Sequence, residues 1–144
     1  MTDDTSPTTD NFARIYPSYL ECMTQLLIAL REVCDSDLDK ALIMAVIGDR
    51  HFARRVSDEA PTLANLGATE VRPGPSVNTL SVAQYTEIPR ETVRRKVNAL
   101  VETGWVSSDP KGNLAPTQAA AEALKDGTHA TIRFIERMSK VTGS

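Results

Sequence analysis

The segment from Ser81 to Val106 concentrates the residues that could bind a polyanion. Its sequence, SVAQYTEIPRETVRRKVNALVETGWV, places Arg90, Arg94, Arg95 and Lys96 in the first two turns of one predicted helix, against the single acidic residue Glu91. An arginine can pair bidentately with the edge of guanine in the major groove. A helix N-terminus adds free N–H groups that favour a phosphate. The segment therefore predicts contact with nucleic acid.

The faces of this helix divide these residues by role. Three apolar residues form its inward stripe: Val93, Val97 and Leu100. At 100° per residue, Glu91, Arg95 and Asn98 lie opposite that stripe. The flanks carry the other candidates: Arg90, Thr92, Arg94 and Lys96. Arg95 points most directly outward, so we expect it to read bases in the major groove, while Arg94 and Lys96 contact phosphates on either side.

The neighbouring residues predict how this helix is positioned. A short helix from Leu80 to Glu87 precedes a break at Ile88-Pro89, and the second helix then runs to Thr103. Ala83 is small enough for the helices to cross closely, and Pro89 presets φ at the first turn. Gly104 ends the helix. Two short strands around the turn signal Ser108-Asp109-Pro110-Lys111-Gly112 predict a β-hairpin.

This arrangement resembles the winged-helix DNA-binding domains of bacterial transcriptional regulators, and its framing by further helices is most similar to the MarR family. The resemblance rests on Ala83, Ile88-Pro89, Thr92-Val93, Arg95, Val97, Leu100, Gly104, Val106, the hairpin and Thr117. Two departures stand out, since Glu87 occupies a position where such motifs usually have Gly, and the hairpin has Lys111 as its only basic residue.

The resemblance implies a homodimer whose flanking helices form the subunit interface. The dimer then places two recognition helices, one from each subunit, on a palindromic operator. Together with the charge pattern, the resemblance gives the expected double-stranded DNA contacts: Ser81, Gln84, Arg90, Glu91, Thr92, Arg94, Arg95, Lys96 and Lys111. It also implies a small aromatic or phenolic effector between the dimer helices and the DNA-binding lobe. The expected polar lining of that pocket is Tyr16, His51 and Arg55.

The remaining elements suit this organisation. Residues 1–11 are polar and acidic, so we expect a disordered tail before one winged-helix domain over 12–144. The DNA-binding lobe is expected at about 76–117. The dimerisation helices are expected at about 15–56, with Pro17 in the first turn and Ser36 capping the second helix, and at about 117–141, where Thr117 is the cap and Gly127 a point of bending or splitting. Their apolar stripes predict a mostly apolar dimer interface above ~2,000 Å².

Composition limits the other classes of function. The net charge is −3, but residues 71–117 hold six basic and four acidic residues and are locally basic. The longest apolar run is Ala41 to Ile47, too short to cross a bilayer, and the polar N-terminus does not read as a signal peptide, so we expect a cytoplasmic protein. Two cysteines and two histidines show no metal-ligand spacing. We therefore expect no metal, no cofactor and no catalysis.

One alternative stays open at this stage. A winged helix can also serve as a protein-interaction module without binding DNA. The acidic net charge and the nearly neutral hairpin favour that alternative. A positive surface across both reading helices would favour DNA.

Overall fold

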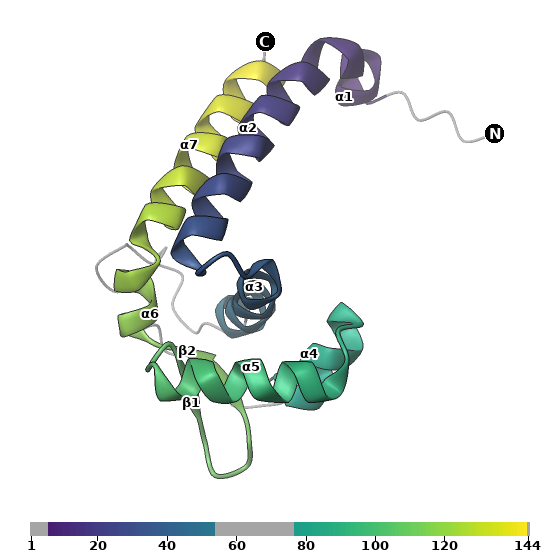
Figure 1. Cartoon of the computed structure of the whole chain (residues 1–144). Coiled ribbons are helices and arrows are strands. Elements are labelled where there is room, and N and C mark those ends of the chain that lie inside the picture. The colour runs from purple at the N-terminus through teal and green to yellow at the C-terminus, as the bar shows by residue number, and fades with distance from the viewer. Residues whose placement is uncertain (1–5, 54–76, 144) are drawn as a thin grey trace, which may run out of the picture.

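The computed structural model describes residues 6–53 and 77–143 of the chain (Figure 1). These residues form seven helices and one two-stranded antiparallel sheet, which confirms the expected mainly α fold with a small β element. Arg55 and most of the connector after the third helix lie outside the described residues. The elements are α1 (Pro7–Asp10), α2 (Phe12–Val33), α3 (Leu38–Ala53), α4 (Thr79–Thr86), α5 (Arg90–Glu102), β1 (Val106–Ser108), β2 (Leu114–Pro116), α6 (Gln118–Ala123) and α7 (Lys125–Thr142).

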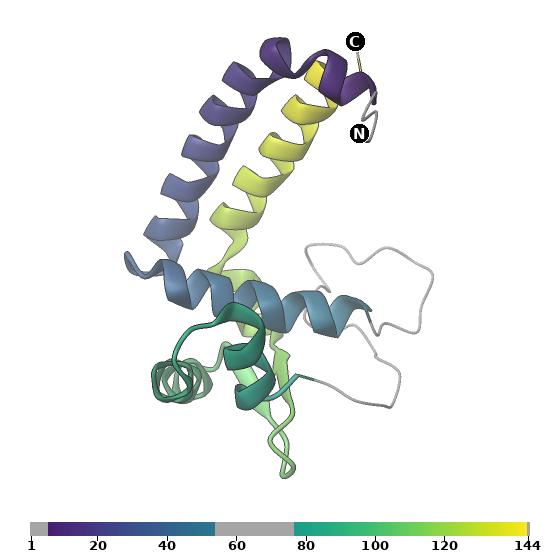
Figure 2. The ribbon, with the colours of Figure 1, turned by 90° about the vertical axis from the view of Figure 1, so that its right-hand side faces the viewer.

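Helices α2 and α7 lie antiparallel, side by side, and project away from the rest of the molecule (Figures 1 and 2). We call this pair the stem. Gly127 of α7 sits close to α2, where an added Cβ would come within 3.3 Å of Val33 and 3.4 Å of Leu30. Farther along, Arg137 donates two hydrogen bonds, of 3.1 and 2.9 Å, to the carboxylate of Glu21. Close backbone approach and a cross-helix ion pair therefore join the two helices.

The other end of the molecule is a compact unit of α4, α5 and the β1–β2 hairpin, which we call the lobe. Helix α3 crosses between stem and lobe. It is seen end-on in Figure 1 and lengthwise in Figure 2, where α5 in turn is seen end-on. Ile43 and Ile47 in the centre of α3 are 0 % exposed, so its apolar middle joins the core of the lobe. This confirms that the all-apolar sequence ALIMAVI marks the centre of the fold.

The end of α5 and the hairpin follow the predicted local signals. Gly104 has φ +84°, and the N–H groups of Gly104 and Trp105 bond the carbonyls of Val101 and Leu100, which is a Schellman motif. The hairpin pairs Val106 with Pro116 and Ser108 with Leu114.

Thr117 caps α6 as expected, since its side chain accepts a hydrogen bond from the Ala120 N–H. The segment before α4 is tied to the sheet as well, because the Leu114 N–H donates to the Val77 carbonyl.

Residues 1–5 of the expected disordered tail lie outside the described residues, and most of the described remainder is helical. Residues 7–10 form a helical turn, because Ser6 accepts a hydrogen bond from the Thr9 N–H and Pro7 presets the first helical φ. Helix α2 then starts at Phe12, so Pro17 lies inside the helix and not in its first turn. Burial of Ile15 explains the earlier start, since an apolar contact before Pro17 stabilises the added turn.

Two expected helix boundaries were also wrong. Asp37, not Ser36, caps α3, because its carboxylate accepts the Lys40 N–H at 3.0 Å while Ser36 has a left-handed φ of +64°. The last helical segment breaks at Leu124, between α6 and α7, and not at Gly127. Gly127 is instead needed for the close approach of α7 to α2.

Candidate nucleic-acid interface

The turn between α4 and α5 depends on an unusual backbone conformation. Glu87 has φ +62° and ψ +12°, the left-handed region that favours glycine. Its N–H still bonds the Ala83 carbonyl at 2.9 Å, and Ile88 packs against the core. Pro89, with φ −54°, then starts α5 in its new direction. The geometry explains why a glycine would be the easier residue at Glu87.

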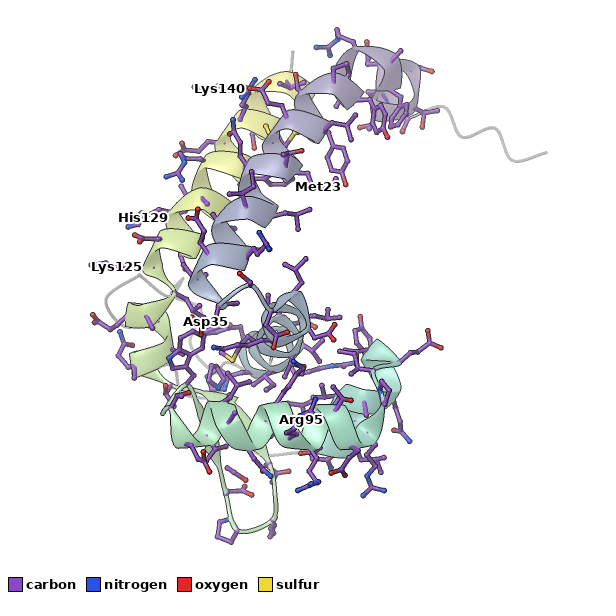
Figure 3. The ribbon with its side chains drawn as sticks, viewed as in Figure 1. Met23, Asp35, Arg95, Lys125, His129 and Lys140 are labelled. Atoms are coloured by element: carbon purple, nitrogen blue, oxygen red, sulfur yellow. The ribbon has the colours of Figure 1, made fainter. Side chains whose placement is uncertain are left out.

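The inner and outer faces of α5 are divided as predicted. Val93, Val97 and Leu100 are buried in the core of the lobe. Arg90, Glu91, Arg94, Arg95 and Asn98 are exposed, and Thr92 is half-buried. Figure 3 labels Arg95 midway along the helix. The sequence thus predicted the exposed face of α5 correctly.

The ion pairs on α5 leave two arginines available. Glu91 binds Arg94 through two hydrogen bonds, one of them 3.0 Å long. The hydrogen bond from Arg94 lowers the pKa of Glu91, so this carboxylate stays charged and offsets its partner. Arg90 and Arg95 form no ion pair within the described part of the chain. The free positive charge of the face therefore lies on these two side chains.

Lys96 is not on the exposed face of α5, where the expected phosphate contact would require it. Its side chain is only 22 % exposed, and its Nζ pairs with the Asp37 carboxylate before α3. Lys96 is thus turned back toward the corner between α2 and α3, because the flank of α5 on which it lies faces that corner and not solvent.

At the N-terminus of α4, one of the two expected DNA contacts, Ser81, is engaged within the protein. Ser81 and Asn78 form a reciprocal capping box, in which each side chain accepts the other residue's backbone N–H. The Ser81 hydroxyl also donates to the Asn78 carbonyl at 2.9 Å. Gln84 remains exposed. Ser81 therefore stabilises the start of α4, and Gln84 is the freer of the two polar side chains.

The hairpin tip is held by its own aspartate. The Asp109 carboxylate accepts the N–H groups of Lys111 and Asn113, each at 2.9 Å, and the Asn113 side chain. These bonds, led by the one from the Asn113 backbone, lower the pKa of Asp109 and keep it charged. Exposed Lys111 is thus the one cation beside a fixed negative charge at this tip.

Of the three residues expected to line an effector pocket, Arg55 lies outside the described residues, and the other two, Tyr16 and His51, do not come together. Tyr16 stacks between Phe12 and Tyr19 near the outer end of the stem, with ring centroids 4.9 and 6.1 Å away. His51 is buried near the far end of α3 against the edge of Phe52. Seventeen residues of α2 separate Tyr16 from Val33, or roughly 26 Å of helix. The sequence could not show this, because both residues simply lie near apolar stripes.

A different cavity does lie between the stem and α3. It has a volume of about 310 Å³ and is walled by α2, α3, α6 and α7. Small side chains leave the space, chiefly Ala41, Ala45 and Gly48 on one face of α3. The described lining has no charged side chain. Two lining hydroxyls, of Thr128 and Thr131, are already used within their own helix. The cavity is therefore an apolar one.

The stem exposes more apolar surface than the lobe. On α2, Phe12, Tyr16, Leu20 and Leu27 fall within an arc of about 80°. Ile28 and Ile135 are 54 % and 57 % exposed, and Ile132 lies beside Ile135 on α7. Exposed apolar stripes of this kind are typical of interaction surfaces.

The comparisons with known proteins add no further constraint. No family model, curated protein or solved structure matches the chain. Among the described helices, none combines the length and the apolar character needed to span a bilayer.

Proposed function

We propose that the protein is a homodimeric regulator of the winged helix-turn-helix type that binds double-stranded DNA through α5. The observation that carries the proposal is the outward face of this helix. Arg90 and Arg95 are exposed there without an ion pair among the described residues, on a helix fixed to the core by its opposite face. A rigid helix with free arginines at its N-terminal half suits direct reading of the major groove.

The remaining contacts follow from the same geometry. Arg95 would reach base edges, with Arg90, Glu91 and Thr92 beside it. Arg94, Gln84 and Lys111 would meet the backbone of the DNA, since each is exposed around α5. Lys96 is left out of the phosphate contacts because Asp37 holds its ammonium group. MarR-like regulation of transcription without catalysis remains part of this proposal.

The stem would supply the dimer interface. Its exposed apolar stripe on α2 and the neighbouring Ile132 and Ile135 on α7 suit a self-complementary helical contact. A two-fold axis through the stems would place two copies of α5 on successive half-sites of a palindrome.

A second candidate function is a protein-interaction module. Asp109 and the paired Glu91–Arg94 reduce the positive charge around α5, which favours a protein partner over DNA. The two functions differ in their salt dependence, because only DNA binding releases counterions from a phosphate backbone.

The decisive experiment is selection of bound duplexes from random DNA, followed by titrations of Arg95→Ala at several salt concentrations. We expect a palindromic site. Loss of one bidentate contact should weaken binding to that site by about 1–3 kcal/mol and relax base choice at one position. Lys125→Ala, which removes an exposed cation of the stem, is the matched control and should bind like the parent. Equal binding of all duplexes by parent and Arg95→Ala would favour the protein-interaction module.

An effector would occupy the apolar cavity between stem and α3. Because no charge lines its described walls, we expect a neutral aromatic or aliphatic molecule and not an aromatic acid. Thermal-shift titrations with toluene, phenol and benzoate should give stabilisation by the first two only. Gly48→Leu is the control that fills the space, since a Cβ there meets only Phe52, at 4.0 Å. Stabilisation by benzoate alone, or stabilisation that survives Gly48→Leu, would contradict the assignment.

A further inference from the structure

We define the corner between α2 and α3 as residues 34–40. This corner contacts α5 and Trp105, which follows the C-terminal turn of α5. Figure 3 labels Asp35 in this corner, above α5. The first contact is the ion pair between Asp37 and Lys96. The second joins Lys40 to Trp105. Lys96 lies midway along α5, whereas Trp105 lies three residues after the end of this helix, so the two contacts involve different parts of this segment.

The Asp37–Lys96 pair is more than a surface ion pair. Both side chains are largely covered, at 31 % and 22 % exposure, and 59 positions separate them in sequence. Asp37 also caps α3 through its bond to the Lys40 N–H, so one carboxylate serves both helices. Partial burial raises the pKa of Asp37, but the hydrogen bonds from Lys96 and from the Lys40 backbone outweigh it and leave that pKa lowered.

The Lys40 contact completes a second link. Its Nζ lies 4.2 Å from the centroid of the Trp105 ring and 3.1 Å from the Asp35 carboxylate. The lysine side chain is 17 % exposed and thus lies between the carboxylate and the ring. A cation over an indole face is attracted by the ring quadrupole, the more so when it is shielded from water.

The backbone of the corner is itself unusual. Asp35 and Ser36 are consecutive residues with left-handed φ values of +54° and +64°. Non-glycine residues rarely adopt this region, so the surrounding contacts must hold them there. The Ser36 N–H bonds the Arg31 carbonyl at 2.8 Å, and the Asp37 N–H bonds the Cys34 carbonyl at 2.9 Å. The corner is therefore an ordered turn held by backbone hydrogen bonds.

We propose that this corner is a strut that sets the direction of α5 relative to the stem, with Asp37 and Lys40 as positioning residues for DNA binding. The core already holds the inner face of α5, and these two contacts add a link between the corner and the segment that runs from α5 to Trp105. The stem sets the spacing of the two copies of α5 in a dimer, so their presentation to successive half-sites depends on this link. The inference rests on the proposed function for its consequence, but not for its geometry.

The test uses Asp37→Asn and Lys96→Met in the full chain. Asparagine keeps an oxygen that can cap α3, so the first variant removes the charge and spares the cap. Both variants should weaken binding to the selected palindrome by a similar factor, roughly 2- to 30-fold. The slope of log affinity against log salt should stay unchanged, because no phosphate contact is lost. The double variant should be no weaker than either single one, and Lys96→Arg should restore much of the affinity.

The sign of the Asp37→Asn effect separates the strut from simple electrostatics. Removing an acidic residue makes the protein more positive, so charge alone predicts tighter DNA binding. Tighter or unchanged binding by Asp37→Asn, together with a lower salt slope in Lys96→Met, would show that Lys96 contacts phosphate and overturn the proposal. Lys125→Met, with the same charge change on the stem, is the matched control.

A second readout does not depend on DNA. The chain has one tryptophan, Trp105, so acrylamide quenching of its fluorescence reports directly on the contact between Lys40 and Trp105. Asp37→Asn and Lys96→Met should each raise the quenching, as should Lys40→Ala, which removes the side chain that covers the ring. If the parent binds no DNA, the proposed function fails, and this readout still decides on the strut. Unchanged quenching in both variants would overturn it.

Discussion

The lobe and the stem use apolar residues in opposite ways. In the lobe, the apolar residues of α5 and the hairpin meet one another and α3 in a single core. In the stem, α2 and α7 contact each other along their length, yet only Ile15, Cys22, Gly127 and Ala130 are buried within these helices. Apolar content alone therefore does not make a closed core. Elements that pack from several directions cover one another's apolar side chains, whereas a pair of helices packed side by side leaves its outer faces open.

The largest expected effect lies in the core of the lobe. Leu100 is 1 % exposed, so Leu100→Ala should lower the free energy of unfolding by about 2–5 kcal/mol through lost burial and the cavity left behind. Urea unfolding followed by circular dichroism measures it. The adjacent exposed Val101→Ala is the control and should change little. Equal losses in both variants would mean that α5 is not anchored by this core.

The open face of the stem predicts a different kind of loss. Leu27→Glu should cost the isolated subunit little, since this side chain is already 42 % exposed, but it should weaken dimerisation by about 2 kcal/mol or more. Analytical ultracentrifugation over a range of concentrations measures the shift. Leu80→Glu makes the same change in the lobe, at 43 % exposure, and should leave the dimer intact. A parent that is already monomeric at micromolar concentration would remove the dimer from the proposal.

The turn between α4 and α5 offers a gain in stability. Glu87→Gly relieves the left-handed backbone and should raise the free energy of unfolding by about 0.5–1 kcal/mol, after the added entropy of the unfolded glycine. Glu87→Ala removes the same side chain without relieving the backbone, so it should give no comparable gain. If alanine stabilised as much as glycine, the side chain and not the backbone would be the source of strain.

The smallest expected effect is the ion pair across the stem. Bonding to Arg137 lowers the pKa of Glu21 below its ordinary 4.5. The ion pair therefore contributes fully to the stability of the folded state above pH 4.5, and this contribution is lost as the pH falls through the lowered folded pKa of Glu21. Exposed pairs add little, so Glu21→Gln should barely move the thermal midpoint at pH 7, and the midpoints of variant and parent should converge as the pH falls through the lowered folded pKa. A large loss at pH 7 would show that this pair is shielded, for example within a dimer.

Much of the lobe could be predicted because its signals are local. The inward stripe of α5, the end of that helix at Gly104, the hairpin turn and the Thr117 cap each depend on residues a few positions apart. The face of α5 that exposes Arg90 and Arg95 follows from the same period. The exposure of these residues was thus set by the helical repeat once the apolar stripe had chosen its side.

Other features were decided by contacts between distant segments. The partnership of Lys96 with Asp37 spans 59 positions, so the sequence showed only a lysine on the flank of a helix and an aspartate in a helix break. The separation of Tyr16 from His51 and the cavity at Gly48 depend on how α2, α3 and α7 cross. Helical periodicity determined which side of each helix turns inward. Only tertiary packing determined what that side meets, because the angles between helices depend on the combined shape of all their side chains.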